Sequence, residues 1–466
     1  MCIGSGGSVG REGPIVQIGS SVGSTLASLL RVDPFQQKTL VGCGAAAGIA
    51  ATFNAPIAGT LFALEILLGD FGLTSFSPVV LSSVTATVIS RHYFGDFPSF
   101  VIPAYSITSN WEYFIYPFLG VATGIVAVAF VTVLYKSEDL FDALKIPNFL
   151  KSTLGGLLLG IILLAFPQVF GVGYGAIDLA LMDQLSVWLM FILVLMKILA
   201  TSITLGSGGS GGVFAPSLFI GAMTGSFFGW SVHTLFPGVT STPGAYALVA
   251  MGALVAGSTH APITAILIIF EMTNDYKIIL PLMTSCIIST AVASILKTGN
   301  IYTIKLMRRG VDLKRDVSQA LLRSLPVRKY MSMQVEIIPE NMPLAQIIET
   351  FRTRNASYLH VLNDKGELSG IISFRDIRPL LGQNVPNENV SAKDVATTRL
   401  SVLMPDDNVL SAVEIMCDGP YSQLPVLDPE SGKLIGTLRQ KDVMAAYDKE
   451  VLRHGVRPGA GLGSTS

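Results

Sequence analysis

The sequence GSGGSVGREGP at residues 4–14 decides the fold of this chain, because it returns as GSGGSGGVFAP at residues 206–216. Both copies open with the same residues and end in a proline that leads into an apolar helical pattern. Glycines let successive backbone N–H groups converge, and a proline in the first helical turn sacrifices no hydrogen bond. Each copy is therefore expected to end at a helix N-terminus that attracts an anion. Close-packing turns between membrane helices are the simpler alternative.

A second repeated pattern indicates that the apolar part consists of two related halves. NAPI from Asn54 is followed by Glu65, and HAPI from His260 is followed by Glu271 at the same spacing. Helices that break at corresponding positions of two halves favour a substrate site near the middle of the bilayer. The two glutamates are expected to bind backbone amides or to bridge helices, and His260 to cap a helix.

Charged residues are spread unevenly along the chain. Residues 1–300 hold 23 of the 63 charged residues, so an apolar membrane part precedes a soluble part. Basic residues between 305 and 315 follow the apolar part and place the soluble part in the cytoplasm. Six stretches approach the ~20 residues that a crossing helix needs. These expected spans are residues 77–94, 111–135, 149–166, 187–205, 214–236 and 276–296.

Other features exclude several classes of protein. The net charge is −1 and no basic surface is indicated, which argues against a nucleic-acid partner. The four cysteines are scattered and are interpreted as small core residues, not as disulfides or metal ligands. Neither glycine-rich loop ends in the Gly-Lys-Ser or Gly-Lys-Thr of a phosphate-binding loop, and no nucleophile lies beside a base. An enzyme is therefore not expected.

Several motifs, in this order along the chain, resemble the CLC family of chloride channels and transporters: GREGP at 10–14, FNAP at 53–56, GGVFAP at 211–216, FEMT at 270–273 and Tyr302. The resemblance implies that residues 1–310 form an α-helical polytopic membrane domain with two inverted-type repeats and broken helices. It also implies a homodimer in the lipid bilayer, with an anion path in each subunit. Family members carry further helices and another glycine-serine loop upstream. The resemblance therefore implies that these N-terminal helices are missing, and neither the preferred anion nor conduction by this chain can be predicted.

The resemblance also assigns roles to individual residues. Glu12 would be the gating carboxylate, which occupies the outer anion site when ionised and leaves it when protonated or displaced. Backbone amides around Arg11 and Gly13 would line that outer site. The bound substrate ion, chloride, would be held at a central site by the amides of Val213 and Phe214 and the hydroxyl of Tyr302.

Physical reasoning about the charged residues gives independent support. A carboxylate within a membrane segment is costly, so it is usually functional or paired. The alternative for Glu12 is a solvent-exposed cap that pairs with Arg11. Lys197 lies inside an apolar run and is expected to face a polar interior or to extend its amine toward the membrane surface.

The residue after Glu65 bears on mechanism. CLC members that exchange chloride for protons usually carry a second glutamate there, whereas this chain has Ile66. The resemblance therefore favours passive conduction of chloride or a similar anion through a pore in each subunit, gated by Glu12 and regulated by the cytoplasmic part of the chain. A chloride/proton antiporter is the alternative, because some exchangers lack the second carboxylate.

The soluble part is itself a repeat. The stretch from Pro339 to Asp376 has the same length as that from Pro405 to Asp442, and each predicts a helix followed by two strands. The pattern predicts a small α/β unit and resembles a pair of CBS domains. The expected boundaries are a linker at 311–326, a first domain at 327–383, a second at 390–450 and a disordered tail at 451–466.

The CBS resemblance raises the question of a nucleotide ligand. Ser373 and Asp376 fit the positions that contact an adenine nucleotide in that family, whereas in the second copy Asp442 is retained but Arg439 replaces the hydroxyl. The alternative is a packing and dimerisation module without a ligand. A further hypothesis is a non-conducting membrane anchor that carries a nucleotide-sensing tail.

Overall fold

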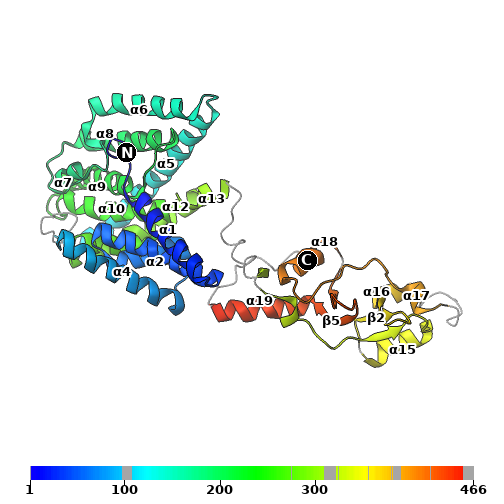
Figure 1. Cartoon of the computed structure of the whole chain (residues 1–466). Coiled ribbons are helices and arrows are strands. Elements are labelled where there is room, and N and C mark those ends of the chain that lie inside the picture. The colour runs from blue at the N-terminus through cyan, green and yellow to red at the C-terminus, as the bar shows by residue number, and fades with distance from the viewer. Residues whose placement is uncertain are drawn as a thin grey trace. The chain divides into compact units, whose positions relative to one another are not determined.

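The computed structural model describes residues 2–96, 108–273, 275–308, 322–323, 325–354, 356–378, 380, 390–419 and 421–454. They belong to two compact units, Met1–Arg309 and Gly310–Ser466, which are drawn in Figure 1. Most of the expected linker lies outside the described residues. The expected tail does so from residue 455 onward, because the last helix continues to His454.

The first unit is helical and contains the same series of four helices twice. Short 3₁₀ turns lie between its helices: η2 (Asn110–Phe114), η3 (Pro167–Val169) and η4 (Tyr276–Ile278). The first series is α1 (Glu12–Leu30), α2 (Pro34–Phe53), α3 (Pro56–Phe62) with the π-helical η1 (Ala63–Leu68), and α4 (Leu73–Phe94). The second series is α9 (Phe214–Leu235), α10 (Pro243–Thr259), α11 (Pro262–Thr273) and α12 (Ile279–Leu296). Between and after them lie α5 (Tyr116–Ala143), α6 (Asn148–Ala165), α7 (Tyr174–Leu181), α8 (Val187–Gly206) and α13 (Thr303–Arg308).

Local chemistry explains where these helices begin and end. The Asp33 side chain accepts hydrogen bonds from the N–H groups of Phe35 and Gln36 and caps α2. In the two halves, Asn54 follows α2 and His260 follows α10 as C-cap residues, both in the left-handed conformation, with φ of 57° and 54°. The prediction that His260 caps a helix is confirmed, at the C-terminal end.

Small residues allow the paired helices of each half to pack closely. A Cβ atom on Gly19 of α1 would collide with the carbonyl of Gly44 in α2, and one on Gly44 would collide with the carbonyl of Gly19. In the second half, a Cβ atom on Gly221 of α9 would lie 2.6 Å from the carbonyl oxygen of Ala250 in α10. Figure 1 shows α1 beside α2, and the same contact recurs between α9 and α10.

Five helical segments among the described residues are long and apolar enough to cross a membrane: Leu73–Phe94, Asn110–Ala143, Asn148–Ala165, Val187–Gly206 and Tyr276–Leu296. They coincide with five of the six expected spans. The sixth, 214–236, forms the full-length helix α9 but is not among these five. Its first thirteen residues, through Ser226, are buried inside the protein, so this part of α9 belongs to the core.

The second unit contains two sheets. In the first sheet, β1 (Ile337–Pro339) pairs in parallel with β2 (Tyr358–Leu362), which pairs antiparallel with β3 (Leu368–Ser373). In the second, β4 (Gln423–Leu427) pairs antiparallel with β5 (Leu434–Arg439). In each copy a helix precedes two of these strands, as the sequence predicts. The helices are α15 (Leu344–Arg354), α16 (Phe374–Ile377), α17 (Ala392–Val395), α18 (Val409–Asp418) and α19 (Gln440–His454), and a 3₁₀ turn, η5, covers Val327–Lys329.

The two copies of this unit exchange their leading segments. Leu325 and Val327 pack in the apolar core of the second copy, whereas Ala392 packs in the core of the first. The backbone repeats the exchange, because Val409 N–H donates to the Leu325 carbonyl at 2.8 Å and Leu344 N–H donates to the Val390 carbonyl at 2.9 Å. The pair is therefore one interlocked unit.

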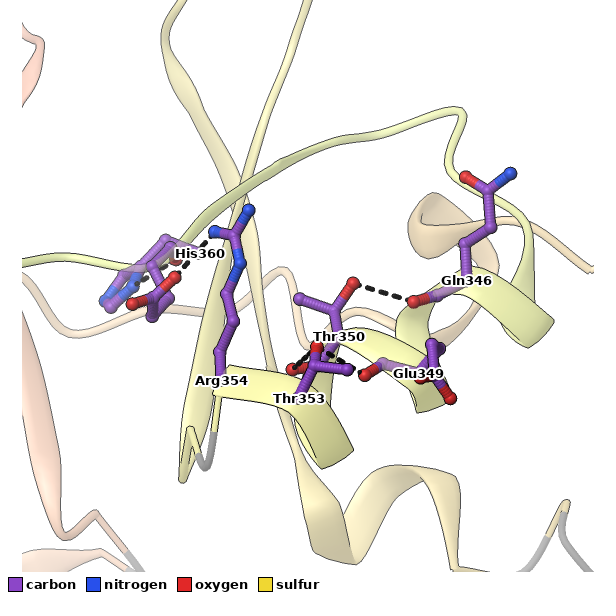
Figure 2. Close-up of polar contacts among 7 residues, drawn as sticks. Gln346, Glu349, Thr350, Thr353, Arg354 and His360 are labelled. Atoms are coloured by element: carbon purple, nitrogen blue, oxygen red, sulfur yellow. Dashed lines mark hydrogen bonds and ion pairs between the residues drawn. The ribbon is translucent and has the colours of Figure 1, made fainter.

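One polar region of the first copy lies where α15 meets β2. Figure 2 shows Arg354 at the end of α15 beside His360 of β2, and Arg354 forms an ion pair with Glu336 at 2.7 Å. On the exposed face of α15, the hydroxyl of Thr350 donates to the backbone carbonyl of Gln346. His360 itself is completely buried, and burial lowers the pKa of its imidazole.

Candidate functional site

The two glycine-rich loops meet in the first unit, as their repetition predicts. Gly10 N–H donates to the Gly212 carbonyl at 2.8 Å, and Gly212 N–H donates to the Gly10 carbonyl at 2.7 Å. A Cβ atom on Gly13 would lie 3.0 Å from the Gly212 Cα, so the backbones also touch beyond these bonds. The N-termini of α1 and α9, which follow the two loops, are thereby brought to one place.

Glu12 is the first residue of α1 and is buried in this junction, with 3% of its surface exposed. The N–H groups of Glu12 and Ala215 lie near the carboxylate, but neither oxygen has a hydrogen-bond partner of good geometry among the described residues. A Cβ atom on Gly212 would lie 3.0 Å from Oε2. The alternative of a solvent-exposed cap is therefore wrong, because the Glu12 side chain is buried, although Arg11 is exposed.

The second loop presents its helix to the same region. Val213 precedes α9 and Phe214 opens it, and both are buried. The ring of Phe214 packs against Phe53 at the end of α2, with 5.5 Å between ring centroids. Backbone N–H groups at the start of α9 thus lie in an apolar, water-poor setting, which strengthens their attraction for an anion.

Tyr302 reaches the same region from the segment after α12. Its N–H donates to Asn300 Oδ1 at 2.9 Å, and Asn300 Nδ2 donates to the Thr259 carbonyl at 2.8 Å. The side chain packs against the apolar core and is close enough to Glu12 for electrostatic interaction. The residues expected around the anion path are therefore brought together: Arg11, Glu12, Gly13, Val213, Phe214 and Tyr302.

Two residues that the sequence did not single out also belong to this region. Tyr174, the first residue of α7, interacts electrostatically with both Arg11 and Glu12. Ser8, inside the first loop, donates its hydroxyl to the Val169 carbonyl at 2.8 Å. Tyr174 has no counterpart in the repeat, so no pattern marks it. Ser8 could have been identified from its place in the loop.

The geometry defines what this region can do chemically. Two helix N-termini direct their free N–H groups and the positive ends of their dipoles toward one place, which suits a monovalent anion. The Glu12 carboxylate is itself an anion in that place. A carboxylate and a free anion would therefore compete for the same donors, and protonation of the carboxylate would favour the free anion.

The repeated glutamates cap each other's helices. Glu65 accepts from Thr264 N–H at 2.7 Å and from the Thr264 hydroxyl at 2.6 Å, at the start of α11. Glu271 of α11 accepts from Ile57 N–H at 3.0 Å and Ala58 N–H at 2.7 Å, at the start of α3. The prediction that these glutamates bind backbone amides is confirmed.

The candidate nucleotide residues of the two copies differ in their engagement. Asp376 Oδ2 accepts from both the N–H and the hydroxyl of Ser373 at 2.7 Å. In the second copy, Arg439 donates to Asp442 through Nε at 2.6 Å and through Nη2 at 2.9 Å, so both carboxylate oxygens are occupied. The first copy therefore has the more available carboxylate.

Both parts of the chain match models of known families. The model of a family described as voltage gated chloride channel matches residues 1–294, and that of the CBS domain matches residues 327–382 and 392–449. A putative chloride channel protein ClcB-like from Ralstonia nicotianae is 39% identical over 318 residues, which cover 67% of this chain and 74% of that protein. An H(+)/Cl(-) exchange transporter ClcA from Vibrio parahaemolyticus is 36% identical, with coverage of 67% and 68%.

Solved structures of CLC proteins are also similar to this chain. A slow cyanobacterial Cl-/H+ antiporter is 32% identical and superposes with a TM-score of 0.59 over 66% of this chain and 73% of that one. A eukaryotic CLC transporter superposes with a TM-score of 0.57 over 93% of this chain and 77% of that one. At 20% identity, the second similarity bears on the fold alone.

Proposed function

The chain belongs to the CLC family of voltage-gated chloride channels and transporters, which move anions across membranes, and on that premise we propose that it is a chloride/proton antiporter whose gate is Glu12. The observation that carries the proposal is the buried Glu12 carboxylate at the junction of the two glycine-rich loops. Its position makes one group responsive to both an anion and a proton.

The relatives support exchange at least as well as the channel that the sequence favoured. The Vibrio parahaemolyticus relative is named an exchange transporter, and the 32% identical structure is that of an antiporter. Ile66 remains the observation that favours a channel, because its side chain packs on the apolar core and supplies no second carboxylate. The Ralstonia nicotianae relative, named a putative chloride channel, keeps that second candidate open.

The proposed mechanism depends on competition at the start of α1. Ionised Glu12 occupies the outer site and interacts with the helix N-terminus, so a chloride ion is excluded. A proton removes the charge, the side chain loses that attraction, and chloride takes its place beside the amides near Arg11 and Gly13. The amides of Val213 and Phe214 and the hydroxyl of Tyr302 then hold the ion one step deeper. The carboxylate returns to the outer site only when Glu12 loses its proton, and exchange requires that this proton leaves to the side opposite to the one from which it came.

The chain is an integral membrane protein, and we propose that it works as a homodimer in the lipid bilayer with the CBS pair in the cytoplasm. Large apolar side chains lie exposed on α4 and α12, including Leu81, Val88 and Ile287, which suits contact with lipid or a second copy. The CBS pair would regulate transport, with an adenine nucleotide as its ligand at the first copy.

The decisive experiment measures chloride efflux from liposomes that contain the purified chain while the external pH is recorded. We expect efflux down an imposed chloride gradient with proton uptake in a fixed ratio. Efflux with a flat pH trace would mean a channel. Absence of efflux from protein shown to be inserted and dimeric would contradict transport by this chain and leave the non-conducting, nucleotide-sensing anchor.

A further inference from the structure

Lys197 in α8 is a cation buried inside the membrane unit. None of its surface is exposed, although its helix is among the most apolar of the chain. Its Nζ donates to the carbonyl of Gly171 at 2.8 Å and to those of Val169 and Val172 at 3.2 Å each. The expectation of a polar interior is met by backbone carbonyls, and the alternative, extension toward the membrane surface, is wrong.

The coordination fits the charged form of the side chain. An ammonium group has three N–H donors, and three carbonyl oxygens receive them. The centroid of the Phe219 ring lies 4.8 Å from Nζ, and the ring adds a cation–π contact. No carboxylate among the described residues lies within ion-pair distance of Nζ, so the more distant Glu12 is the acid that can offset the charge of the ammonium group.

Two connections join this cation to the gate. The Val169 carbonyl accepts both from Lys197 Nζ and from the hydroxyl of Ser8, so the ammonium group and the first glycine-rich loop are fixed to the same peptide group. Lys197 is also within electrostatic range of Glu12. The other groups that act on the Glu12 carboxylate are Arg11, Tyr174 and Tyr302.

The charge of Lys197 affects whether chloride or the Glu12 carboxylate is the favoured anion near the glycine-rich loops. With Glu12 ionised, the carboxylate and the ammonium group offset each other. With Glu12 protonated, the buried positive charge is left without its counterpart, and an anion near the gate restores the balance. A neutral side chain at residue 197 would stabilise neither the ionised Glu12 carboxylate nor a bound anion.

We propose that Lys197 is a positioning residue of the anion path, which fixes the first glycine-rich loop through Val169 and supplies the positive charge that ties chloride occupancy to the protonation of Glu12. The inference rests on the proposed function, since it needs a chloride path gated at Glu12. In this role Lys197 raises the affinity for chloride and sets the pH dependence of transport without touching the ion.

The test compares Lys197→Gln with Lys197→Arg in the whole chain. Chloride binding is measured by calorimetry with KCl in gluconate buffer, and transport is measured in liposomes from pH 4 to 8. Loss of one nearby charge is expected to weaken chloride binding about tenfold in Lys197→Gln. Protonation of Glu12 should then need less acid, so half-maximal transport moves to higher pH. Lys197→Arg keeps the charge and is expected to keep the wild-type midpoint.

Controls separate this role from a structural one. In a Glu12→Gln background, Lys197→Gln is expected to weaken chloride binding but to cause no pH shift, because the titrating group is gone. A dimeric Lys197→Gln protein with wild-type affinity and midpoint would overturn the inference. If that variant does not fold, a shifted midpoint in Lys197→Arg would overturn it, whereas an unchanged one supports it. A wild-type chain without chloride binding or transport would instead contradict the proposed function itself.

Discussion

Gly10 and Gly212 exchange two backbone hydrogen bonds, at 2.8 and 2.7 Å, although they lie in different halves of the chain. The exchange joins the loop that precedes Glu12 to the loop that precedes α9. It is possible only because neither residue has a side chain, since a Cβ atom on Gly212 would lie 2.7 Å from Gly13 N and 3.0 Å from Glu12 Oε2. The geometry around Glu12 therefore depends on this contact.

Gly212→Ala is expected to separate the two loops. The new methyl group meets backbone on one side, which cannot move aside as a side chain can, so chloride efflux should fall at least tenfold and both loop hydrogen bonds should weaken. The matched control is Gly156→Ala on α6, where nothing lies within 4 Å of the added atom. Efflux from liposomes measures both, and equal rates for Gly212→Ala and wild type would contradict the assigned junction.

Glu12→Ala is expected to leave the anion path open and insensitive to external pH. The variant lacks the only carboxylate in the junction that the structure describes, so nothing there competes with chloride or takes up a proton. Glu12→Gln, which keeps the size but not the charge, should behave in the same way. Efflux between pH 4 and 8 measures the effect. A variant that still responds to pH would show that another group is the gate.

Glu65 and Glu271 carry a prediction about stability. Each charged carboxylate caps a helix of the other half, so Glu271→Gln should reduce the free energy of unfolding by about 1 kcal/mol, and Glu65→Gln by a similar amount. The matched control is Asp142→Asn, at an exposed position near the end of α5. Thermal unfolding in detergent measures the loss. Variants as stable as the control would mean that the caps contribute little.

The repeat explains which of these features could be predicted from the sequence. Because Gly10 and Gly212, and likewise Glu65 and Glu271, occupy equivalent positions in two halves, a shared site and a shared role follow from the pattern alone. The partners of Lys197 could not be predicted, because the carbonyls that receive it belong to a segment without repeated residues. The exchange of leading segments in the CBS pair could not be predicted from the sequence either. Both copies have the same apolar pattern, so a segment such as Leu325 fits either core.

The difference between Asp376 and Asp442 predicts one adenine nucleotide per chain. Asp442 has both oxygens engaged by Arg439, whereas only Oδ2 of Asp376 accepts the bonds from Ser373. Titration of the whole chain with ATP should therefore show binding that Asp376→Ala abolishes and Asp442→Ala leaves within twofold. Equal loss in both variants would place the nucleotide between the copies. Binding that neither variant changes would exclude these carboxylates.

The burial of His360 predicts that the first CBS copy loses stability in mild acid. Its Nδ1 lies 3.3 Å from the Glu336 carbonyl, and Nε2 is buried without a partner among the described residues, so the folded site has no place for a second proton. Burial holds the pKa of the folded imidazole below its usual value, near 6.5 in the unfolded chain. The unfolded chain therefore binds the proton first. Stability is complete above about pH 6.5 and falls by at most ~1.4 kcal/mol per pH unit below it.

Hydrogen exchange measured on the whole chain can locate this loss. Protection factors of the β2 amides, such as that of Val361, are expected to fall between pH 7.5 and 5.5, and His360→Phe should remove the dependence while it keeps a planar side chain of similar size. Strand β4 is the internal reference, because Pro425 occupies the corresponding position in the second copy. A fall of equal size in β2 of His360→Phe would mean that another group in the unit takes up the proton.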